Sequence, residues 1–317
     1  RRVLFRSVIP ALEILTRSRA QRRDSEAIRT IVMEPTRELV IQTAEVFRSI
    51  GKYLDITVLG LFGGVEQDPQ IARLQHGVDV LVCTPGRLFD LVSQGYVNLR
   101  GIKLLVLDEA DQMLDLGFIN DIRQLIKLLP RYRQTLFFSA TINPEIKELA
   151  YSLVSKPVKI EISPKDPVSK HVNHCVSYIE MDDKRFVLGR VRKENPDDKM
   201  LIFVRTKVRA ERVKGAMERV DIQCETIHGS KTQQERNKVM QDFRTGALKI
   251  LIATDVSARG IDIPDIETVI NYDLPEQTEN YVHRVGRTGR GNKFGMSISF
   301  CSKEERPLLE EIESFLT

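Results

Sequence analysis

Three carboxylates follow an apolar run about one third of the way along the chain. Asp108, Glu109 and Asp111 come directly after residues 104–107, Leu-Leu-Val-Leu, which have the length and composition of a buried strand. Ligands of open α/β sheets bind at the carboxyl ends of strands. Acids in this position are typical of a site where one carboxylate holds Mg²⁺ and its neighbour orients water for attack on a γ-phosphate. Taken alone, acids in this position are more often only a solvated turn.

The same arrangement recurs along the first half of the chain. Apolar runs at 30–33, 80–83 and 136–138 each lead into a polar cluster. Such near-continuous apolar strands are typical of buried parallel sheets. Between them lie amphipathic stretches such as 121–129, whose apolar residues are spaced to line one face of a helix. The alternation predicts βαβ units.

The pattern begins again after a break at 163–169, which is rich in turn residues and poor in apolar ones. Further strand-like runs occur at 201–204, 226–227, 250–253 and 269–272. Single cores rarely grow past about 250–300 residues, and this chain has 317. The sequence therefore predicts an α/β protein with two tandem parallel-sheet domains, at 8–162 and 170–317, joined by a linker at 163–169.

The polar clusters resemble, in order, the motifs of the DEAD-box RNA helicases of superfamily 2. The matching segments are Pro35-Thr36-Arg37-Glu38-Leu39, Gly63-Gly64, Thr84-Pro85-Gly86-Arg87, Asp108 to Asp111, Ser139-Ala140-Thr141, Ile202-Phe203-Val204, His228-Gly229 with Gln233 and Arg236, Ala253-Thr254-Asp255 with Ala258 to Asp262, and His283 to Arg290. The resemblance implies two RecA-like domains with ATP and RNA bound across the cleft between them. Within the family, Gly117-Phe118-Ile119 and Ile227 to Lys231 look most like the bacterial RhlE-like group.

The resemblance implies a set of nucleotide contacts. Asp108 would hold Mg²⁺, mainly through water, and Glu109 would position the attacking water. Arg287 and Arg290 would neutralise charge on the transferred phosphoryl group. Asp262 would reach the ribose of ATP, although a simple turn aspartate is an open alternative. A basic helix face is the alternative for the arginines.

Coupling and RNA contacts also follow from the resemblance. The network that couples hydrolysis to RNA binding would comprise Asp111, Ser139, Thr141 and His283, with a purely structural core network as the alternative. The RNA contacts would be Thr36, Arg37, Gly64, Thr84, Arg87, Gly229, Gln233, Arg236 and Thr254. Such contacts touch the sugar-phosphate backbone, so we expect a structured RNA partner with little sequence preference. With 48 basic and 44 acidic residues, the net charge of +4 alone would not have indicated RNA.

One departure from the family limits the expected activity. The sequence contains no G-x-x-x-x-G-K-[ST] loop and no glutamine-containing adenine motif, and Gly229-Ser230-Lys231-Thr232 lacks the spacing of such a loop. Residues 1–7 do not resemble the family, whereas those from Val8 onward do. We interpret 1–7 as a non-native artefact, with a divergent natural segment as the alternative, and the first domain as incomplete. The chain as written should therefore be a poor ATPase.

Two classes of function remain open on these grounds. The first is an ATP-dependent RNA helicase, and the second is an RNA-binding scaffold that does not need a nucleotide. The helicase is favoured because a scaffold would have no need of Glu109, Arg287 and Arg290 at these positions. The four cysteines are far apart, which indicates a reducing, cytoplasmic location, and no apolar run reaches the length of a membrane helix.

Overall fold

The computed structural model describes residues 2–17, 28–141, 144–154, 156–161, 170–258, 265–290 and 293–316. The chain forms two compact units, Arg1–Ile160 (unit 1) and Glu161–Thr317 (unit 2). Both are parallel-sheet α/β structures, which confirms the predicted fold class. The predicted linker at 163–169 lies outside the described residues.

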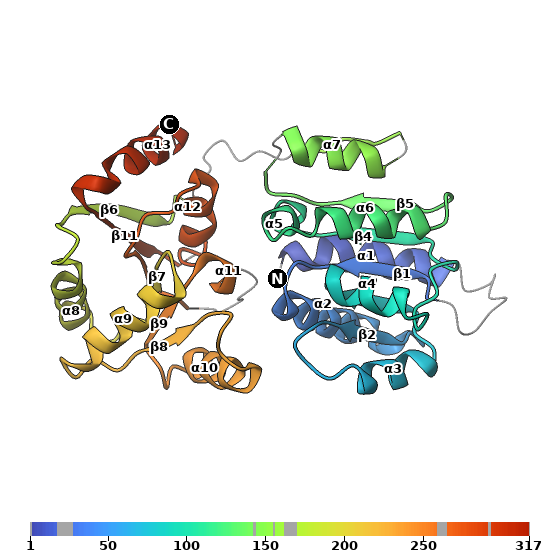
Figure 1. The fold of residues 1–317 in the computed structure, drawn as a ribbon, viewed down its shortest axis with the longest axis horizontal. Coiled ribbons are helices and arrows are strands. Elements are labelled where there is room, and N and C mark those ends of the chain that lie inside the picture. The colour runs from blue at the N-terminus through green and yellow to red at the C-terminus, as the bar shows by residue number, and fades with distance from the viewer. Residues whose placement is uncertain are drawn as a thin grey trace. The chain divides into compact units, whose positions relative to one another are not determined.

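Among its described residues, unit 1 contains a five-stranded parallel sheet with the order β2-β3-β1-β4-β5 (Figure 1). Its strands are β1 (Thr30–Met33), β2 (Val58–Leu61), β3 (Val80–Cys83), β4 (Leu104–Leu107) and β5 (Gln134–Phe137). Every residue of β1, β3 and β4 is buried, as expected for strands covered on both faces. The edge strand β5 is only partly buried.

Helices cover both faces of this sheet. They are α1 (Arg2–Arg17), α2 (Arg37–Ile50), α3 (Asp68–Gln75), α4 (Pro85–Ser93), α5 (Ala110–Asp115), α6 (Ile119–Leu128) and α7 (Pro144–Leu153), with a 3₁₀ turn η2 at Gly51–Tyr53. Successive strand residues point to opposite faces. Val32 therefore packs in one buried cluster with Val8 of α1 and Phe47 of α2, whereas Ile31 packs in another with Leu88 of α4.

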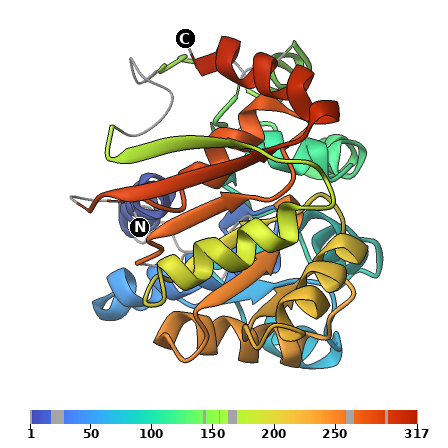
Figure 2. The ribbon, with the colours of Figure 1, turned by 90° about the vertical axis from the view of Figure 1, so that its left-hand side faces the viewer.

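Unit 2 contains, among its described residues, a six-stranded parallel sheet with the order β6-β11-β10-β7-β9-β8 (Figure 2). Its strands are β6 (Val172–Tyr178), β7 (Met200–Phe203), β8 (Glu225–Ile227), β9 (Ile250–Ala253), β10 (Thr268–Asn271) and β11 (Gly295–Cys301). Its helices are α8 (Lys184–Glu194), α9 (Lys207–Glu218), α10 (Gln233–Thr245), α11 (Asp255–Ala258), α12 (Thr278–Val285) and α13 (Arg306–Leu316), with a 3₁₀ turn η3 at Lys303–Glu305. Within the described part of the chain, no helix combines the length and apolar character needed to cross a bilayer.

Both sheets place polar segments at the carboxyl ends of their strands. In unit 1 the last residues of β1, β3, β4 and β5 pair in register across the sheet. The segments that follow them, which begin at Glu34, Thr84, Asp108 and Phe138, therefore start side by side. In unit 2 the last residues of β7, β9 and β10 pair in the same way. Each unit thus gathers several predicted motifs at one edge of its sheet.

Candidate functional site

The candidate metal ligand Asp108 is buried where β4 ends, with 1% of its surface exposed. Its Oδ1 accepts hydrogen bonds from the backbone N–H of Glu109, at 2.9 Å, and from the guanidinium of Arg6. Its Oδ2 is buried and has no hydrogen-bond partner among the described residues. Burial raises the pKa of Asp108, and the positive charge of Arg6 opposes that rise. A further cation at Oδ2 would favour the ionised carboxylate in the same way.

Glu109 occupies the sharp turn between β4 and α5. Its φ of 49° and ψ of 52° are left-handed, an uncommon conformation for a residue with a side chain. Backbone strain of this kind costs about 1–3 kcal/mol and is concentrated at functional sites. The turn points the N–H of Glu109 back to the carboxylate of Asp108. The two predicted catalytic carboxylates therefore share one strained corner of the chain.

Asp111 joins this corner to the segment that follows β5. Its Oδ2 accepts hydrogen bonds from the backbone N–H groups of Ala140 and Thr141, at 3.1 and 3.0 Å, and from the Thr141 hydroxyl at 3.2 Å. The Ser139 hydroxyl donates to the backbone oxygen of Thr141 at 2.7 Å. Three of the four predicted coupling residues thus meet within unit 1. The fourth, His283, lies on α12 of unit 2.

Glu34 is a buried carboxylate that is not among the predicted site residues. It follows β1 with 1% of its surface exposed, and its Oε1 accepts a hydrogen bond from the Thr43 hydroxyl at 2.7 Å. Since β1 and β4 pair in register, Glu34 leaves the sheet beside Asp108. Burial raises the pKa of Glu34 well above its usual value, the charge on Asp108 raises it further, and Thr43 opposes the rise. Its signal in the sequence is one acid between an apolar run and Pro35.

The predicted RNA contacts of unit 1 are Thr36, Arg37, Gly64, Thr84 and Arg87. Two of them reach the loop that follows β2. The Arg37 guanidinium lies 4.5 Å from the ring centre of Phe62, and Arg87 donates a hydrogen bond to the backbone oxygen of Val65 at 2.9 Å. Gly64 lies between these points with a φ of 74°, which favours glycine. Contacts with one loop therefore bring three separate motifs together.

The predicted RNA contacts of unit 2 are Gly229, Gln233, Arg236 and Thr254. Arg236 donates a hydrogen bond to Oε1 of Gln233 at 3.4 Å, so the two side chains lie together on α10. The Ser257 hydroxyl accepts a hydrogen bond from the Thr254 N–H at 3.0 Å and donates one to the last backbone oxygen of β8 at 2.7 Å. Ser257, which was not predicted, thereby brings Thr254 to the strand end that leads into Gly229.

Glu211, on α9, holds the residue before Gly229 in place. Its Oε1 accepts a hydrogen bond from the Thr226 hydroxyl at 2.6 Å, and it lies 2.8 Å from Nε2 of His228 and 3.4 Å from Nζ of Lys231. Partial desolvation raises the pKa of this carboxyl, but these three partners outweigh it and bring the pKa of Glu211 to about 2. An ionised Glu211 therefore positions His228 and the glycine that follows it.

Arg284 is a buried arginine whose role the sequence did not reveal. Its Nε and Nη2 donate hydrogen bonds to the two carboxylate oxygens of Asp255, at 2.5 and 2.7 Å. Its Nη1 donates to Oδ1 of Asn271 and to the backbone oxygen of Asp273, and its guanidinium lies 5.0 Å from the ring centre of Phe203. Arg284 therefore joins α12 to α11 and to the ends of β7 and β10.

The predicted phosphate contacts Arg287 and Arg290 follow Arg284 in the chain. The Nε of each donates a hydrogen bond to the backbone oxygen four residues earlier, at 3.2 and 2.8 Å. Gly289, between them, has a φ of 62°, and a Cβ there would lie 2.4 Å from Cγ2 of Val172. Both observations require glycine. This glycine fixes the turn that separates the two arginines.

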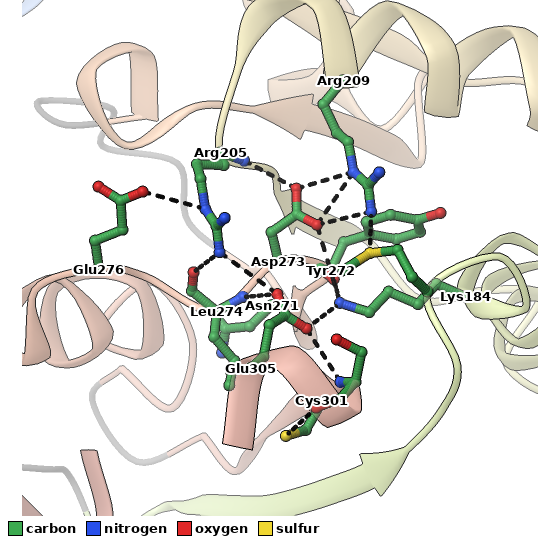
Figure 3. A network of polar contacts seen from close by, with 12 residues as sticks. Lys184, Arg205, Arg209, Asn271, Tyr272, Asp273, Leu274, Glu276, Cys301 and Glu305 are labelled. Atoms are coloured by element: carbon green, nitrogen blue, oxygen red, sulfur yellow. Dashed lines mark hydrogen bonds and ion pairs between the residues drawn. The ribbon is translucent and has the colours of Figure 1, made fainter. Parts of the chain in front are cut away.

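Figure 3 shows a network of charged side chains at the carboxyl end of β10. Lys184 is fully buried, and its Nζ donates hydrogen bonds to the backbone oxygen of Tyr272 at 2.8 Å and to Oε2 of Glu305 at 2.5 Å. Nε of Arg209 donates to both carboxylate oxygens of Asp273, at 3.1 and 3.2 Å. The network, which was not predicted, joins α8, α9 and η3 to the segment that also receives Arg284.

The described residues fit Mg²⁺ at Asp108 but fit ATP only in part. Proteins hold Mg²⁺ with one or two carboxylates together with water and phosphates, and Asp108 offers a buried oxygen without a partner. No group of three or more His, Cys, Asp or Glu side chains suited to a metal occurs in the described part of the chain. The predicted ribose contact, Asp262, lies outside the described residues. The sequence offers no glycine-rich lysine loop for the β- and γ-phosphates.

Comparison with known families covers most of the chain. Residues 7–149 match the family described as DEAD/DEAH box helicase, and residues 183–292 match the helicase conserved C-terminal domain. These two matches contain every predicted site residue of units 1 and 2.

Similar curated proteins include two that are named ATP-dependent RNA helicase RhlB. The protein from Shewanella amazonensis is 40% identical over 305 residues, which are 96% of this chain and 70% of the relative. The protein from Shewanella sp. strain ANA-3 is 41% identical over 290 residues, which are 91% of this chain and 66% of the relative. The chain thus spans about two thirds of the length of these relatives. Because both carry the name RhlB, the finer likeness to an RhlE-like group stays a prediction.

Similar solved structures include two RNA complexes. One is S. cerevisiae Dbp5 bound to RNA and ADP BeF3, with a TM-score of 0.84, 33% identity, and coverage of 96% of this chain and 79% of that one. The other is the DEAD-box helicase Mss116 bound to single-stranded RNA and UDP-BeF, with a TM-score of 0.86, 25% identity, and coverage of 99% of this chain and 67% of that one.

Proposed function

Since this chain belongs to the DEAD-box family of ATP-dependent RNA helicases, we propose that it unwinds short RNA duplexes or remodels RNA–protein complexes by ATP-driven closure of its two RecA-like units. The observation that carries the proposal is the bonding of Asp111 to Ala140 and Thr141. These hydrogen bonds join the Asp108-Glu109 turn to the loop that follows β5. A turn that served only to end β4 would not need a contact with a second loop. The similar structures of Dbp5 and Mss116 in complex with RNA support the same conclusion.

In this proposal the chain holds the nucleotide and orients water. Asp108 would hold Mg²⁺, which would supply positive charge to the phosphates of ATP. Glu109 accepts a hydrogen bond from the attacking water and so orients it. Arg287 and Arg290 place positive charge where negative charge develops, an effect of about 10³–10⁵ in rate where arginine fingers have been measured. Asp262 binds the ribose.

The proposed RNA partner is held by its sugar-phosphate backbone. The candidates supply exposed glycine backbone, hydroxyls and arginines, which are suited to phosphates and riboses rather than to base edges. We therefore expect binding with little dependence on sequence. The contacts that Arg37 and Arg87 make with the loop around Gly64 support a shared surface in unit 1.

For the 317 residues as written we propose ATP hydrolysis at or near background. The sequence has no glycine-rich lysine loop, and this loop is the main anchor of the β- and γ-phosphates in related enzymes. A second candidate is an RNA-binding scaffold that works without nucleotide. The scaffold would bind RNA but would gain nothing from Glu109, Arg287 and Arg290.

RNA binding by the chain tests the assignment of the RNA surface. Fluorescence anisotropy with two labelled 12-nucleotide single strands of different sequence should give similar affinities. Arg236→Ala should weaken binding of both RNAs by a similar factor. It should also lower the slope of log affinity against log salt concentration by about the value of one phosphate contact. Lys238→Ala, which removes an exposed cation from the same helix, is the matched control and should change little. Equal effects of the two variants, or a loss confined to one RNA sequence, would contradict the assignment.

We also propose a reducing, cytoplasmic location. All four cysteines are free thiols, and three of them are buried. Burial raises the pKa of the Cys224 thiol to about 12, so it is a poor nucleophile and disulfide partner. Structural thiols of this kind persist where disulfides are rare.

A further inference from the structure

The outer faces of α8 and α9 enclose a hollow of about 350 Å³ on the surface of unit 2. In Figure 2, α8 lies in front of the strands. The apolar part of the lining consists of Phe186, Gly189, Ala216, Met217 and Val220. No predicted site residue takes part in the lining, so the hollow is separate from the proposed nucleotide and RNA contacts.

Two apolar side chains at this hollow face solvent. Phe186 is 63% exposed and Val220 is 51% exposed. Neither belongs to the buried core cluster of unit 2, to which α8 and α9 contribute Leu188, Ala210, Val213 and Met217. Gly189 of α8 contributes only backbone to the lining. Exposed apolar surface rimmed by polar groups is typical of sites that bind other proteins.

The rim of the hollow is basic. It is formed by Arg185, Arg190 and Lys193, and none of the described lining residues is acidic. Arg185 lies over the ring of Phe186, 4.8 Å from its centre, so positive charge borders the apolar floor directly. Arg190 pairs with Glu194 at 2.9 Å, but both side chains are largely exposed and such pairs are weak. Arg190 can therefore exchange this partner for another carboxylate.

We propose that this hollow docks an acidic segment of a partner protein, which inserts apolar side chains between α8 and α9 and places carboxylates opposite Arg185, Arg190 and Lys193. Charge complementarity selects an acidic partner. The volume lies at the lower end of the range for ligand pockets, about 300–1,000 Å³, which suits a few side chains. RNA is disfavoured, because single strands bind by stacking successive bases on aromatic rings and Phe186 is the one aromatic residue among the described lining residues.

Fluorescence anisotropy of the full chain with three labelled 12-residue peptides tests the proposal. The first peptide combines Asp and Glu with Leu and Phe, the second replaces Leu and Phe by Ser, and the third replaces the acids by Lys. Only the first should bind. Val220→Asp should weaken its binding by about ten-fold or more, because it places a carboxylate in the apolar lining and opposite the acids of the peptide. Val208→Asp is the matched control, since Val208 is 55% exposed on α9 but lies outside the hollow, and it should change binding by less than about two-fold.

A charge exchange tests the role of the rim. The double variant Arg190→Glu with Lys193→Glu should lose the acidic peptide and gain the lysine peptide. Equal effects of Val220→Asp and Val208→Asp on binding of the first peptide would overturn the proposal. Binding of that peptide to the double variant with unchanged affinity would also overturn it. Displacement of the peptide by a 12-nucleotide oligouridine would assign the hollow to RNA instead. Concentration-dependent dimerisation that Val220→Asp abolishes would assign it to a second copy of the chain.

Discussion

Arg284 and Asp255, which are 29 residues apart in sequence, form a two-point ion pair that joins α12 to α11. The remaining guanidinium nitrogen of Arg284 bonds to Asn271 and to the backbone of Asp273. All three nitrogens are therefore engaged inside unit 2. Arg284 is thus a structural arginine, in contrast to the exposed Arg290 that follows it.

Removal of Arg284 should destabilise unit 2 strongly. Arg284→Ala leaves Asp255 without its partner. Breaking a buried pair costs about 3–5 kcal/mol, and the loss here should lie at the lower end because the Asp255 side chain is 25% exposed. Arg284→Lys should recover only part of the loss, because an ammonium group cannot reach both carboxylate oxygens and the backbone together. Amide hydrogen exchange of peptides from β10 and α12, measured at increasing urea concentrations, gives the change in the free energy of unfolding of unit 2. Arg290→Ala should stay within about 0.5 kcal/mol, and a comparable loss in both variants would refute the distinction.

Glu211 should make unit 2 sensitive to acid. Its pKa is about 2 in the folded chain, whereas the ordinary value for a glutamate carboxyl is 4.5. A carboxyl whose pKa is lower when folded adds stability that is fully present above the unfolded pKa and is lost as the pH falls through the folded pKa. Glu211→Gln should therefore lower stability at pH 6 and match the parent chain near pH 2. The effect should be modest, because the side chain is 47% exposed.

Urea unfolding of unit 2 at pH 6 and at pH 3 measures this difference. Glu218→Gln, on the same helix, is the matched control. The Glu218 carboxylate is largely exposed and lies 3.7 Å from Nζ of Lys214, a long and weak pair, so its replacement should have little effect at either pH. A stability loss for Glu211→Gln that does not shrink as the pH falls would contradict the assigned role.

Most of the buried strands could be predicted from apolar runs in the sequence. The strands β1, β3, β4, β7 and β9 are fully buried and fall on runs that stand out in the sequence. Their order across each sheet was not readable, because nothing local to a strand specifies which other strand it pairs with. The position of Asp108 at a strand end was predictable because Asp108 directly follows the apolar run that predicts β4.

The contacts between distant segments could not be predicted. Arg284 stands in a motif with two other arginines, and only folding shows that it is the buried one that meets Asp255. Glu211 lies inside a helix of mixed charge, so its contact with His228 has no local signal. Glu34 differs, since an acid directly after an apolar run could have been singled out as Asp108 was.

The two units should separate under limited proteolysis. Residues 163–169 are rich in turn residues, and each unit has its own buried clusters. We expect cleavage in this segment to leave a stable fragment that contains unit 2, identified by mass spectrometry. Preferential loss of the C-terminal half would contradict the independence of unit 2.

The missing phosphate loop should limit ATP turnover. The 317 residues should hydrolyse ATP at or near background, whereas a version extended with a family-type segment that carries the glycine-rich lysine loop should regain RNA-stimulated turnover. The same extension with its loop lysine replaced by alanine is the control and should remain inactive. ATP turnover at a family-typical rate by the 317 residues alone would contradict the proposed need for a glycine-rich lysine loop.

The most direct test of the proposed function compares Glu109→Gln with Arg236→Ala in the extended version. Glu109→Gln keeps the size of the side chain but removes the carboxylate that orients water, so ATP turnover should fall by orders of magnitude. RNA binding in the presence of a non-hydrolysable ATP analogue should persist in Glu109→Gln and weaken in Arg236→Ala. If Glu109→Gln instead abolished RNA binding as fully as Arg236→Ala, or left turnover unchanged, the proposed division between hydrolysis and RNA binding would be contradicted.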